Sequence, residues 1–230
     1  MRNIYEGNAY SEQNPTWHEE DSPWKANHIQ RIIKDNAVPH RSICEVGCGV
    51  GNILLNLESH FPGSHLFGYE ISPYAYAKAK ERESERTKFH LGDVTAAGEQ
   101  NFDVLLLIDV IEHVEDYISF LRSMKPIGRY KVLHIPLDLS VQSVLRVSPI
   151  MNQRAGIGHI QYFFKDTALA TLRDCGYKVI DHRYTASRLE LPNQARSSRL
   201  MRWPRRLLYA LAPDLAVRLV GGYSLLVLAE

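Results

Sequence analysis

The order of apolar and polar positions divides the chain into short apolar runs that alternate with segments of helical periodicity. Each run has the length of a strand and is bounded by turn residues, so the pattern predicts seven strands. The predicted strands are 42–46, 65–69, 88–91, 102–108, 130–135, 177–184 and 223–229. The run 102–108 (FDVLLLI) is the most apolar, which is typical of a central strand buried on both faces.

Helical segments separate these strands and carry start and stop signals. Ser72 and Pro73 have the residue types of an N-cap and a first helical position, and a second Ser-Pro pair stands at positions 22 and 23. Asp166 or Thr167 caps a later helix, which Gly176 closes. The helices expected from these signals and from the periodicity are 22–33, 50–57, 74–86, 114–124 and 166–175, with a mostly helical insertion at 189–221.

Strands that alternate with helices predict a doubly wound α/β fold, a Rossmann-like sheet of seven mostly parallel strands with a helical insertion before the last strand. The 230 residues suit a single domain. Its expected parts are an N-terminal lid and helix (1–40), a cofactor-binding core (41–188), the insertion (189–221) and the last strand (222–230).

Composition and charge exclude several classes of protein. The net charge of +1 argues against general binding to nucleic acid, although residues 182–220 hold eight arginines and only two acids. The three cysteines, Cys44, Cys48 and Cys175, have no zinc-ligand spacing, so no metal site is expected. The N-terminus lacks the apolar stretch of a signal peptide, and no run approaches the ~20 residues of a membrane span. We therefore expect a cytoplasmic protein.

The chemically informative segment is Glu45-Val46-Gly47-Cys48-Gly49-Val50-Gly51, which follows the first strand. Glycines at alternate positions let the backbone turn sharply and let a ligand lie against it. The next helix presents free N–H groups and the positive end of its dipole. The spacing differs from the G-x-G-x-x-G of dinucleotide-binding turns, and an acid before the first glycine would repel a pyrophosphate but attract an ammonium group.

This segment resembles the first motif of the class I S-adenosylmethionine-dependent methyltransferases, which has the form acid-x-Gly-x-Gly-x-Gly. The run DVIEHVED at 109–116 is similar to the corresponding part of small-molecule methyltransferases of the ubiquinone-biosynthesis type. The resemblance covers roughly residues 42–175. It implies that the cofactor is S-adenosylmethionine, with S-adenosylhomocysteine as product, and that the glycine loop wraps its methionine part.

Three acids after later strands extend the resemblance. Glu70 ends the second strand, where a carboxylate can bind the ribose hydroxyls. Asp93 follows the third strand and by resemblance contacts the adenine amino group, and Asp109 ends the apolar fourth strand and should face the cleft. The expected cofactor-binding residues are Glu45, Gly47, Cys48, Gly49, Gly51, Glu70, Ile71, Asp93, Val94, Asp109 and Val110.

Histidines near the predicted strand ends are the candidates for a catalytic base. His159 lies in a glycine-flanked loop, and family members often carry a similar segment beside the acceptor pocket. His113 follows the fourth strand, where it either acts in catalysis or packs at the start of the helix. His134 is interpreted as a satisfied strand residue. The named catalytic candidates are His159 and His113, and a base could also be absent.

Two segments outside the core bear on the acceptor. Tyr10 and Trp17 in the N-terminal stretch suggest a lid over the cleft, whereas Trp24 is expected to pack as plain core. The segment 196–218 interleaves arginines with apolar residues, which suits either a solvated face over a core helix or a peripheral contact with a membrane or a lipid-linked substrate.

The sequence therefore predicts methyl transfer to an oxygen or nitrogen of a small molecule, with a sugar or a lipid-linked precursor among the acceptors considered. An RNA or DNA methyltransferase is disfavoured because no N/D-P-P-F/Y segment follows the fourth strand. A scaffold that binds the cofactor without catalysis stays open. The oligomeric state is left undetermined.

Overall fold

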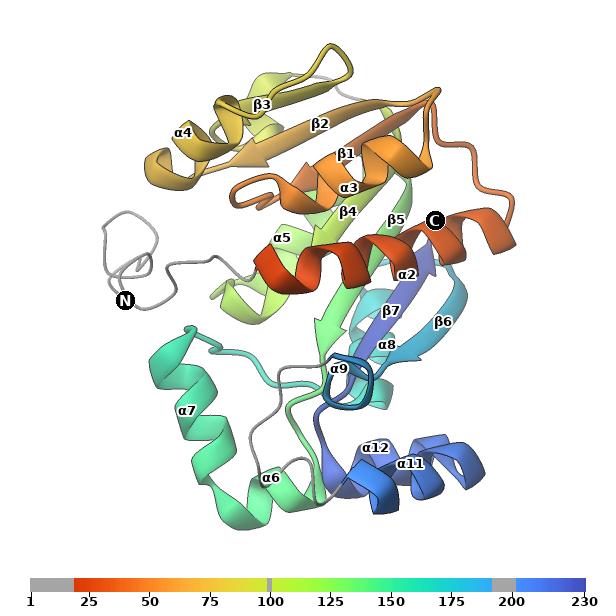
Figure 1. Cartoon of the computed structure of the whole chain (residues 1–230). Helices are drawn as coiled ribbons and strands as arrows, with labels where there is room; N and C mark the ends of the chain where they lie inside the picture. The colour runs from red at the N-terminus through yellow and green to blue at the C-terminus, as the bar shows by residue number, and fades with distance from the viewer. Residues whose placement is uncertain (1–18, 99–100, 192–201) are drawn as a thin grey trace.

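A computed structural model describes residues 19–98, 101–191 and 202–230, and they form one seven-stranded sheet flanked by helices (Figure 1). The strand order is β3-β2-β1-β4-β5-β7-β6. Strands β1 to β5 are parallel, and β7 runs antiparallel to both of its neighbours. The strands are β1 (Ser42–Val46), β2 (His65–Glu70), β3 (Thr87–Leu91), β4 (Phe102–Ile108), β5 (Gly128–Pro136), β6 (Val179–Thr185) and β7 (Ser224–Ala229). The predicted fold class is confirmed.

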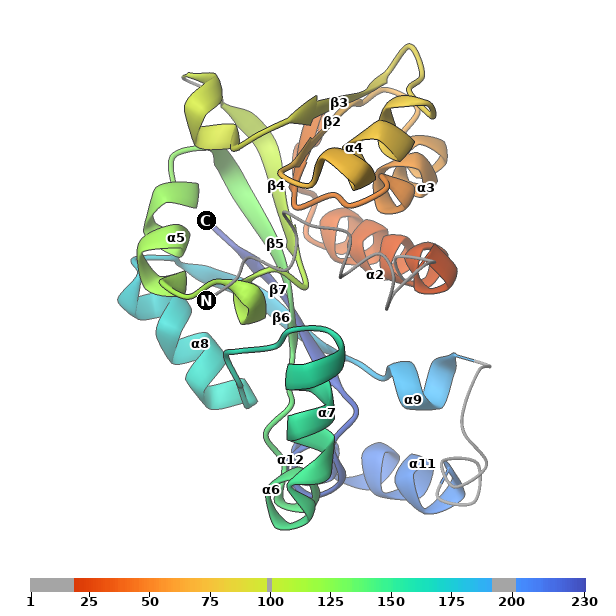
Figure 2. The same ribbon diagram turned by 90° about the vertical axis from the view of Figure 1, so that its left-hand side faces the viewer.

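Helices cover both faces of the sheet, as Figure 2 shows. On one face lie α2 (Ser22–Asp35), α3 (Asn52–His60) and α4 (Pro73–Lys80), and on the other lie α5 (Tyr117–Met124) and α8 (Lys165–Asp174). Strand β4 shows why both faces are apolar: Val104 and Leu106 point to the first layer, and Leu105 and Leu107 point to the second.

The remaining helices lie beyond the carboxyl end of β5, at the bottom of Figure 1. They are α6 (Val141–Arg146), α7 (Ser148–Gly156), α9 (Ser187–Glu190), α11 (Arg202–Leu211) and α12 (Pro213–Val220). Helix α6 packs against α7 and α12, and α12 packs against α11. Helices α6 and α7 were not predicted from the sequence, because their apolar residues Val144, Leu145 and Met151 face solvent and so do not follow a core pattern.

Several predicted boundaries differ from those in the structure. The helix expected over 74–86 ends at Lys80, because the Ser84 hydroxyl accepts hydrogen bonds from the N–H groups of Arg86 and Thr87 in a turn that leads into β3. The helix expected from 114 begins at Tyr117, after the short 3₁₀ helix η3 (Ile111–His113). Thr167 lies three residues inside α8, whose N-cap is Phe164.

Part of the lid prediction lies outside the described residues, since Tyr10 and Trp17 precede position 19, and so does part of the 196–218 segment. Trp24 is half-buried and lines the cleft, and its indole N–H donates to Glu190 over 2.6 Å. Ile29 and Ile33 of the same helix are core residues, as expected. Within the described ranges, no helix is both long enough and apolar enough to span a bilayer.

Candidate active site

A cleft of about 1220 Å³ opens where the strand order reverses between β1 and β4. Doubly wound sheets place ligands at this switch point, because the loops leaving the two strands diverge to opposite faces. Residues that follow β1, β2, β4 and β5 all contribute to the wall, together with the start of α2. The cleft therefore gathers the chemical groups of segments far apart in the sequence.

The glycine loop after β1 forms the wall beside the start of α3. Gly47, Gly49 and Gly51 all have left-handed φ values, of +69°, +55° and +83°. The Gly47 N–H donates to the Tyr69 carbonyl over 2.8 Å, which ties the loop to the end of β2. A Cβ atom at Gly51 would lie 2.4 Å from Cζ of Phe89. The loop thus requires glycine both for conformation and for close packing.

Glu45 in β1 is a buried carboxyl whose Oε2 atom accepts no hydrogen bond within the described ranges. Its side chain lines the cleft next to the glycine loop. Burial raises its pKa well above the usual value, with Glu70 and Asp109 adding to the effect and Lys25 opposing it. An orphaned buried carboxyl is costly, so this atom is suited to a cationic ligand group.

Glu70 holds the glycine loop at the end of β2. Its Oε2 accepts from the Gly49 N–H over 2.8 Å, and its Oε1 accepts from the Ser72 N–H over 2.7 Å. Burial raises the pKa of this carboxyl, although its backbone donors oppose the shift. Each oxygen retains acceptor capacity, so Glu70 can position the loop and still bind a hydroxyl.

The predicted cofactor residues divide into two groups in the structure. Eight line the cleft, and they are Glu45, Gly47, Cys48, Gly49, Glu70, Ile71, Asp109 and Val110. The other three stand behind or beside it. Gly51 precedes α3 and faces Phe89, whereas Asp93 is exposed and caps η2 (Val94–Ala97), in which Val94 is buried.

Asp109 is the centre of a charged network that the sequence did not predict. Its Oδ2 lies 2.7 Å from Lys25 Nζ, and its Oδ1 lies 2.6 Å from Nδ1 of His134, whose Nε2 lies 2.8 Å from the Thr185 hydroxyl. Burial opposes ionisation of Asp109, but His134 and Lys25 outweigh it and hold its pKa below the usual range. Lys25 could have been suspected, because it lies on the same helical stripe as Ile29 and Ile32.

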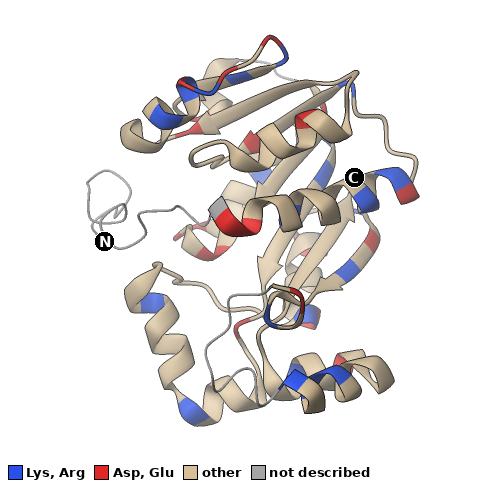
Figure 3. Cartoon of the chain, in the orientation of Figure 1, with Lys and Arg blue, Asp and Glu red and all other residues tan. Residues whose placement is uncertain are grey.

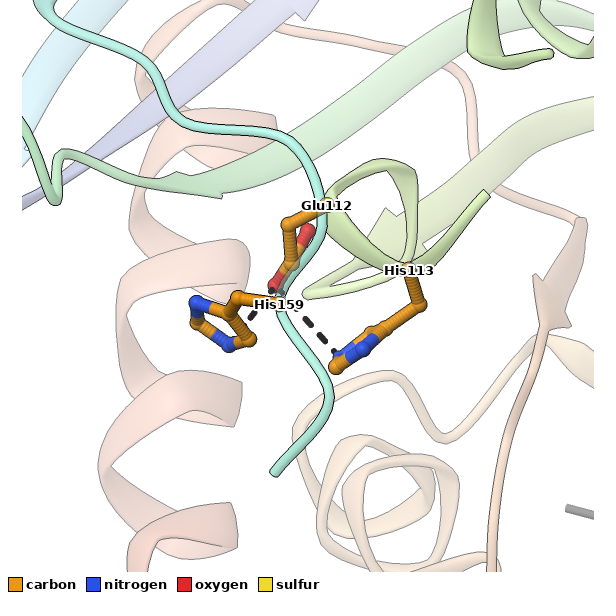
Figure 4. A group of neighbouring side chains, drawn as sticks. All are labelled: Glu112, His113 and His159. Carbon is orange, nitrogen blue, oxygen red and sulfur yellow. Dashed lines mark ion pairs between the residues drawn. The ribbon is translucent and has the colours of Figure 1, made fainter. Parts of the chain in front are cut away.

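The two catalytic candidates meet in the cleft (Figure 4). The rings of His113 and His159 are 5.0 Å apart in an edge-to-face arrangement. Nδ1 of His159 lies 2.6 Å from Asp138 Oδ2, and Nδ1 of His113 lies 3.1 Å from the Gly158 carbonyl oxygen. Burial and the neighbouring His159 lower the pKa of His113 to about 4. Glu112, buried between the rings, was not predicted, although it stands directly beside His113 in the sequence.

Comparison of the sequence with known protein families gives a match in the part of the chain that forms this cleft. Residues 44–127, which run from within β1 to the residue before β5, match the family described as "Methyltransferase domain". This match and the seven-stranded sheet are those of the class I S-adenosylmethionine-dependent methyltransferase fold. The match contains both the glycine loop and the run at 109–116 that carried the resemblance in the sequence.

Similar proteins agree with the methyltransferase fold. Norajmaline N-methyltransferase of Rauvolfia serpentina is 30% identical over 108 residues, which cover 44% of this chain and 36% of that protein. The chain thus matches about a third of the length of that curated relative. An S-adenosylmethionine-dependent methyltransferase from Archaeoglobus fulgidus has a TM-score of 0.57 at 13% identity, covering 89% and 93% of the two chains. Magnesium protoporphyrin IX methyltransferase of Synechocystis, solved with bound cofactor, has a TM-score of 0.55 at 14% identity, covering 99% and 88%.

The residues that line the cleft fit S-adenosylmethionine. S-adenosylmethionine carries an ammonium group, for which the orphaned Glu45 oxygen is a partner of opposite charge. Gly47 and Gly49 line the cleft without side chains, and Glu70 stands at the end of β2 with a buried carboxyl group. Asp109 differs from Glu45 in having partners within the protein, since its carboxylate is paired with Lys25 and His134.

Proposed function

We propose that this methyltransferase transfers the methyl group of S-adenosylmethionine to a nitrogen or oxygen atom of a small molecule. The observation that carries the proposal is the juxtaposition, in one cleft, of the orphaned Glu45 carboxyl and the His113–His159 pair. The first suits the amino-acid part of the cofactor and the second suits an acceptor. The cofactor supplies an activated methyl group when bound, so the protein has mainly to position the acceptor.

The cofactor side of the cleft is formed by β1, β2 and the glycine loop. Glu45 binds the ammonium group, the backbone of Gly47 and Gly49 lies against the methionine part, and Glu70 accepts from the ribose hydroxyls. Asp93 is proposed as the adenine contact, reached from the exposed turn after β3. Ile71, which is 53% exposed although it borders the cleft, becomes covered when the cofactor lies over it.

The acceptor side is formed by η3 and the loop that leads from α7 to α8. His159 and His113 hold the acceptor, or remove its proton, from positions that backbone and Asp138 contacts keep fixed. Positioning of this kind contributes about 7–11 kcal/mol in well-oriented reactions. Proton removal adds about 10²–10⁴-fold for acceptors that need it.

An apolar surface beside the cleft narrows the acceptor class. Most of the exposed large hydrophobic side chains of the described residues lie on α6, α7, α11 and α12 or between them. This end surface comprises Val141, Val144, Leu145, Val147, Met151, Trp203, Leu207, Leu211, Leu215 and Leu219. Exposed apolar side chains gathered on neighbouring helices are candidates for a binding surface, because monomeric proteins seldom expose large apolar patches.

Charge on the same helices favours an anionic membrane as the partner of the end surface. Arg146, Arg154 and Arg206 are exposed there, and Asp214 is the acid among the four helical segments (Figure 3). Arg146 of α6 also lines the cleft, so the cleft borders a helix that carries part of the end surface. We therefore propose a lipid-linked acceptor that enters from the membrane.

Calorimetry with S-adenosylhomocysteine tests the cofactor half of the proposal. We expect wild-type protein to bind it, and Gly49→Val to lose binding because a β-branched side chain strains the left-handed backbone. Gly98→Val, in a left-handed glycine outside the cleft, is the matched control and should bind like wild type. Absence of heat with wild-type protein would refute the assignment.

Turnover of labelled cofactor with lipid extracts as acceptor separates an enzyme from a scaffold.

Liposome flotation tests the membrane half. Wild-type protein should float with phosphatidylglycerol vesicles, and the variant Leu207→Ser with Leu211→Ser should not. Ile180→Ser, an exposed apolar residue on β6, is the control. Arg205 is unsuited to charge removal, because it is buried and donates to the Val220 carbonyl, so Arg146→Gln with Arg206→Gln is the informative charge variant. Wild-type protein that stays at the bottom of the gradient would exclude this part.

A further inference from the structure

Glu112, His113 and His159 form a side-chain cluster held together by backbone contacts between two distant segments. The Glu112 carbonyl accepts from the N–H groups of Ile160 and Gln161, over 2.8 and 3.0 Å. The Gln161 amide donates in turn to the carbonyls of Val114 and Glu115. The loop that carries His159 is therefore fastened along η3, and the three side chains face one another (Figure 4).

The hydrogen bonds of the two imidazoles determine which nitrogen points to Glu112. The Gly158 carbonyl and the Asp138 carboxylate are acceptors, so Nδ1 of His113 and Nδ1 of His159 donate to them. In the neutral ring Nε2 then carries the lone pair. The two Nε2 atoms lie 4.0 and 3.9 Å from the same oxygen, Oε1 of Glu112.

Glu112 supplies the observation that points to a ligand. Its side chain is fully buried, and within the described ranges neither carboxylate oxygen has a hydrogen-bond partner. When neither oxygen of a buried carboxyl has a partner, nothing compensates the free energy lost by removing the group from water. A cation bound to Oε1 and to the two Nε2 lone pairs would give the buried Glu112 carboxylate the partner that it lacks.

We propose that Glu112, His113 and His159 bind a divalent transition-metal ion of the zinc class on the acceptor side of the cleft. The three ligand atoms lie within 4.8 Å of one another. Zinc binds such atoms at about 2.0–2.2 Å, and a tetrahedral site brings them to roughly 3.3 Å of each other. Inward movement of the side chains by about half an ångström reaches that geometry from the present one. This proposal departs from the absence of a metal site expected from the sequence.

The surroundings have the features of a built metal site. Metal-binding histidines donate their second N–H to a carboxylate or a carbonyl, which are the partners that Asp138 and Gly158 provide here. Three protein ligands leave a coordination position open, as in catalytic zinc sites. All three ligand residues line the cleft, so that position can face a bound molecule.

The ligand set selects among metals. Two imidazoles and one carboxylate suit zinc and its transition-metal neighbours, whereas calcium requires six or more oxygen ligands. In the metal-bound enzyme, the ion would hold an oxygen atom of the acceptor, and His113 and His159 would then act on the acceptor through the ion rather than by direct contact or proton removal. This role, unlike the metal site itself, rests on the proposed methyl transfer.

Metal titration of the untagged full chain, dialysed against chelator, tests the site. We expect one equivalent of Zn²⁺ by calorimetry, no response to Ca²⁺, and visible d–d absorption when Co²⁺ replaces Zn²⁺. Glu112→Gln keeps the shape of the side chain but not its charge, and should weaken Zn²⁺ binding at least 100-fold. Asp138→Asn should weaken it about 10–100-fold, since Asp138 orients His159 without touching the ion.

Controls separate this site from other metal ligands and from the proposed function. His65→Ala and Glu81→Gln alter exposed residues elsewhere and should bind Zn²⁺ like wild type. S-adenosylhomocysteine binding should be unchanged in Glu112→Gln, which shows that the variant is folded. Wild-type protein without Zn²⁺ binding, or Glu112→Gln and Asp138→Asn with wild-type affinity, would overturn the site. Loss of S-adenosylhomocysteine binding by wild type would refute the proposed function and leave the metal site standing.

Discussion

Lys25 of α2 forms an ion pair with Asp109, the residue that follows β4, with 2.7 Å between Nζ and Oδ2. Burial opposes the charge on Lys25, but Asp109 outweighs it and raises the pKa of the ammonium group. The pair fastens the N-terminal helix to the end of the central strand, at the floor of the cleft. Asp109 also has a φ of +53°, a left-handed conformation that non-glycine residues seldom adopt.

The first prediction concerns this pair. Lys25→Met leaves the Asp109 charge without its ammonium partner and should lower the free energy of unfolding by about 3 kcal/mol. Asp109→Asn should cost less than Asp109→Ala, because Asn tolerates the left-handed conformation. Chemical denaturation at pH 7 measures the free energy of unfolding of the three variants. A double-mutant cycle then gives the interaction energy between Lys25 and Asp109. Equal stability of Asp109→Asn and Asp109→Ala would contradict the backbone argument.

The second prediction concerns the protonation of Glu45. Burial raises the pKa of this carboxyl well above the usual value, so the free protein holds its proton to a higher pH than an exposed glutamate does. An ammonium group beside it favours the carboxylate, so binding of S-adenosylhomocysteine should lower the pKa of Glu45 and release protons. Calorimetry in buffers of different ionisation enthalpy measures the release. Glu45→Gln, which has no proton to lose, should abolish it, and a release that persists in this variant would contradict the assignment.

The third prediction concerns the contact between Gly51 and Phe89. A Cβ at Gly51 meets Cζ of Phe89 at 2.4 Å, and φ is +83°. Backbone strain and overpacking together should make Gly51→Ala less stable by about 2–4 kcal/mol. Gly63→Ala is the matched control, since nothing lies within 4 Å of its Cβ position and its φ is not left-handed. Urea unfolding compares the two. Phe89→Leu should partly rescue Gly51→Ala, and equal stability of both alanine variants would refute the prediction.

The fourth prediction concerns Lys131, a buried lysine in β5. Burial, aided by Lys125, lowers the pKa of Lys131 to about 8. Between pH 8 and about pH 10.5 the unfolded chain keeps a proton that the folded protein has lost, so this group makes stability rise with pH. Lys131→Met should therefore stabilise the protein at pH 7, by about 2 kcal/mol, and remove this part of the pH dependence.

Thermal unfolding at pH 7, 9 and 10.5 tests the Lys131 prediction, with Lys34→Gln on the exposed side of α2 as control. The difference between Lys131→Met and wild type should shrink as the pH rises. A difference that stays constant with pH would mean that shape rather than charge decides the effect.

Local sequence signals were sufficient for the sheet and the cofactor loop. A strand buried on both faces needs an uninterrupted apolar run, so 102–108 could be placed to the residue. The left-handed turn after β1 requires glycines, so the sequence alone was enough to recognise Gly47, Gly49 and Gly51. Helix ends were less certain, as Lys80 and Phe164 show, because turn and cap contacts with neighbouring segments decide them.

Side-chain partners depended on which segments the fold brings together. Glu112 and His159 are 47 residues apart in sequence, and only the backbone bonds from Ile160 and Gln161 bring their side chains close. The same holds for Lys25 and Asp109, and for the apolar residues of α6 and α11, whose exposure depends on where those helices pack. The sequence alone determined where the strands lie along the chain and the chemistry of the glycine loop, since both follow from local backbone and burial requirements. Tertiary structure alone decided the charged network, the histidine cluster and the end surface, because a side chain's environment is set by neighbours that the chain reaches only after it has folded.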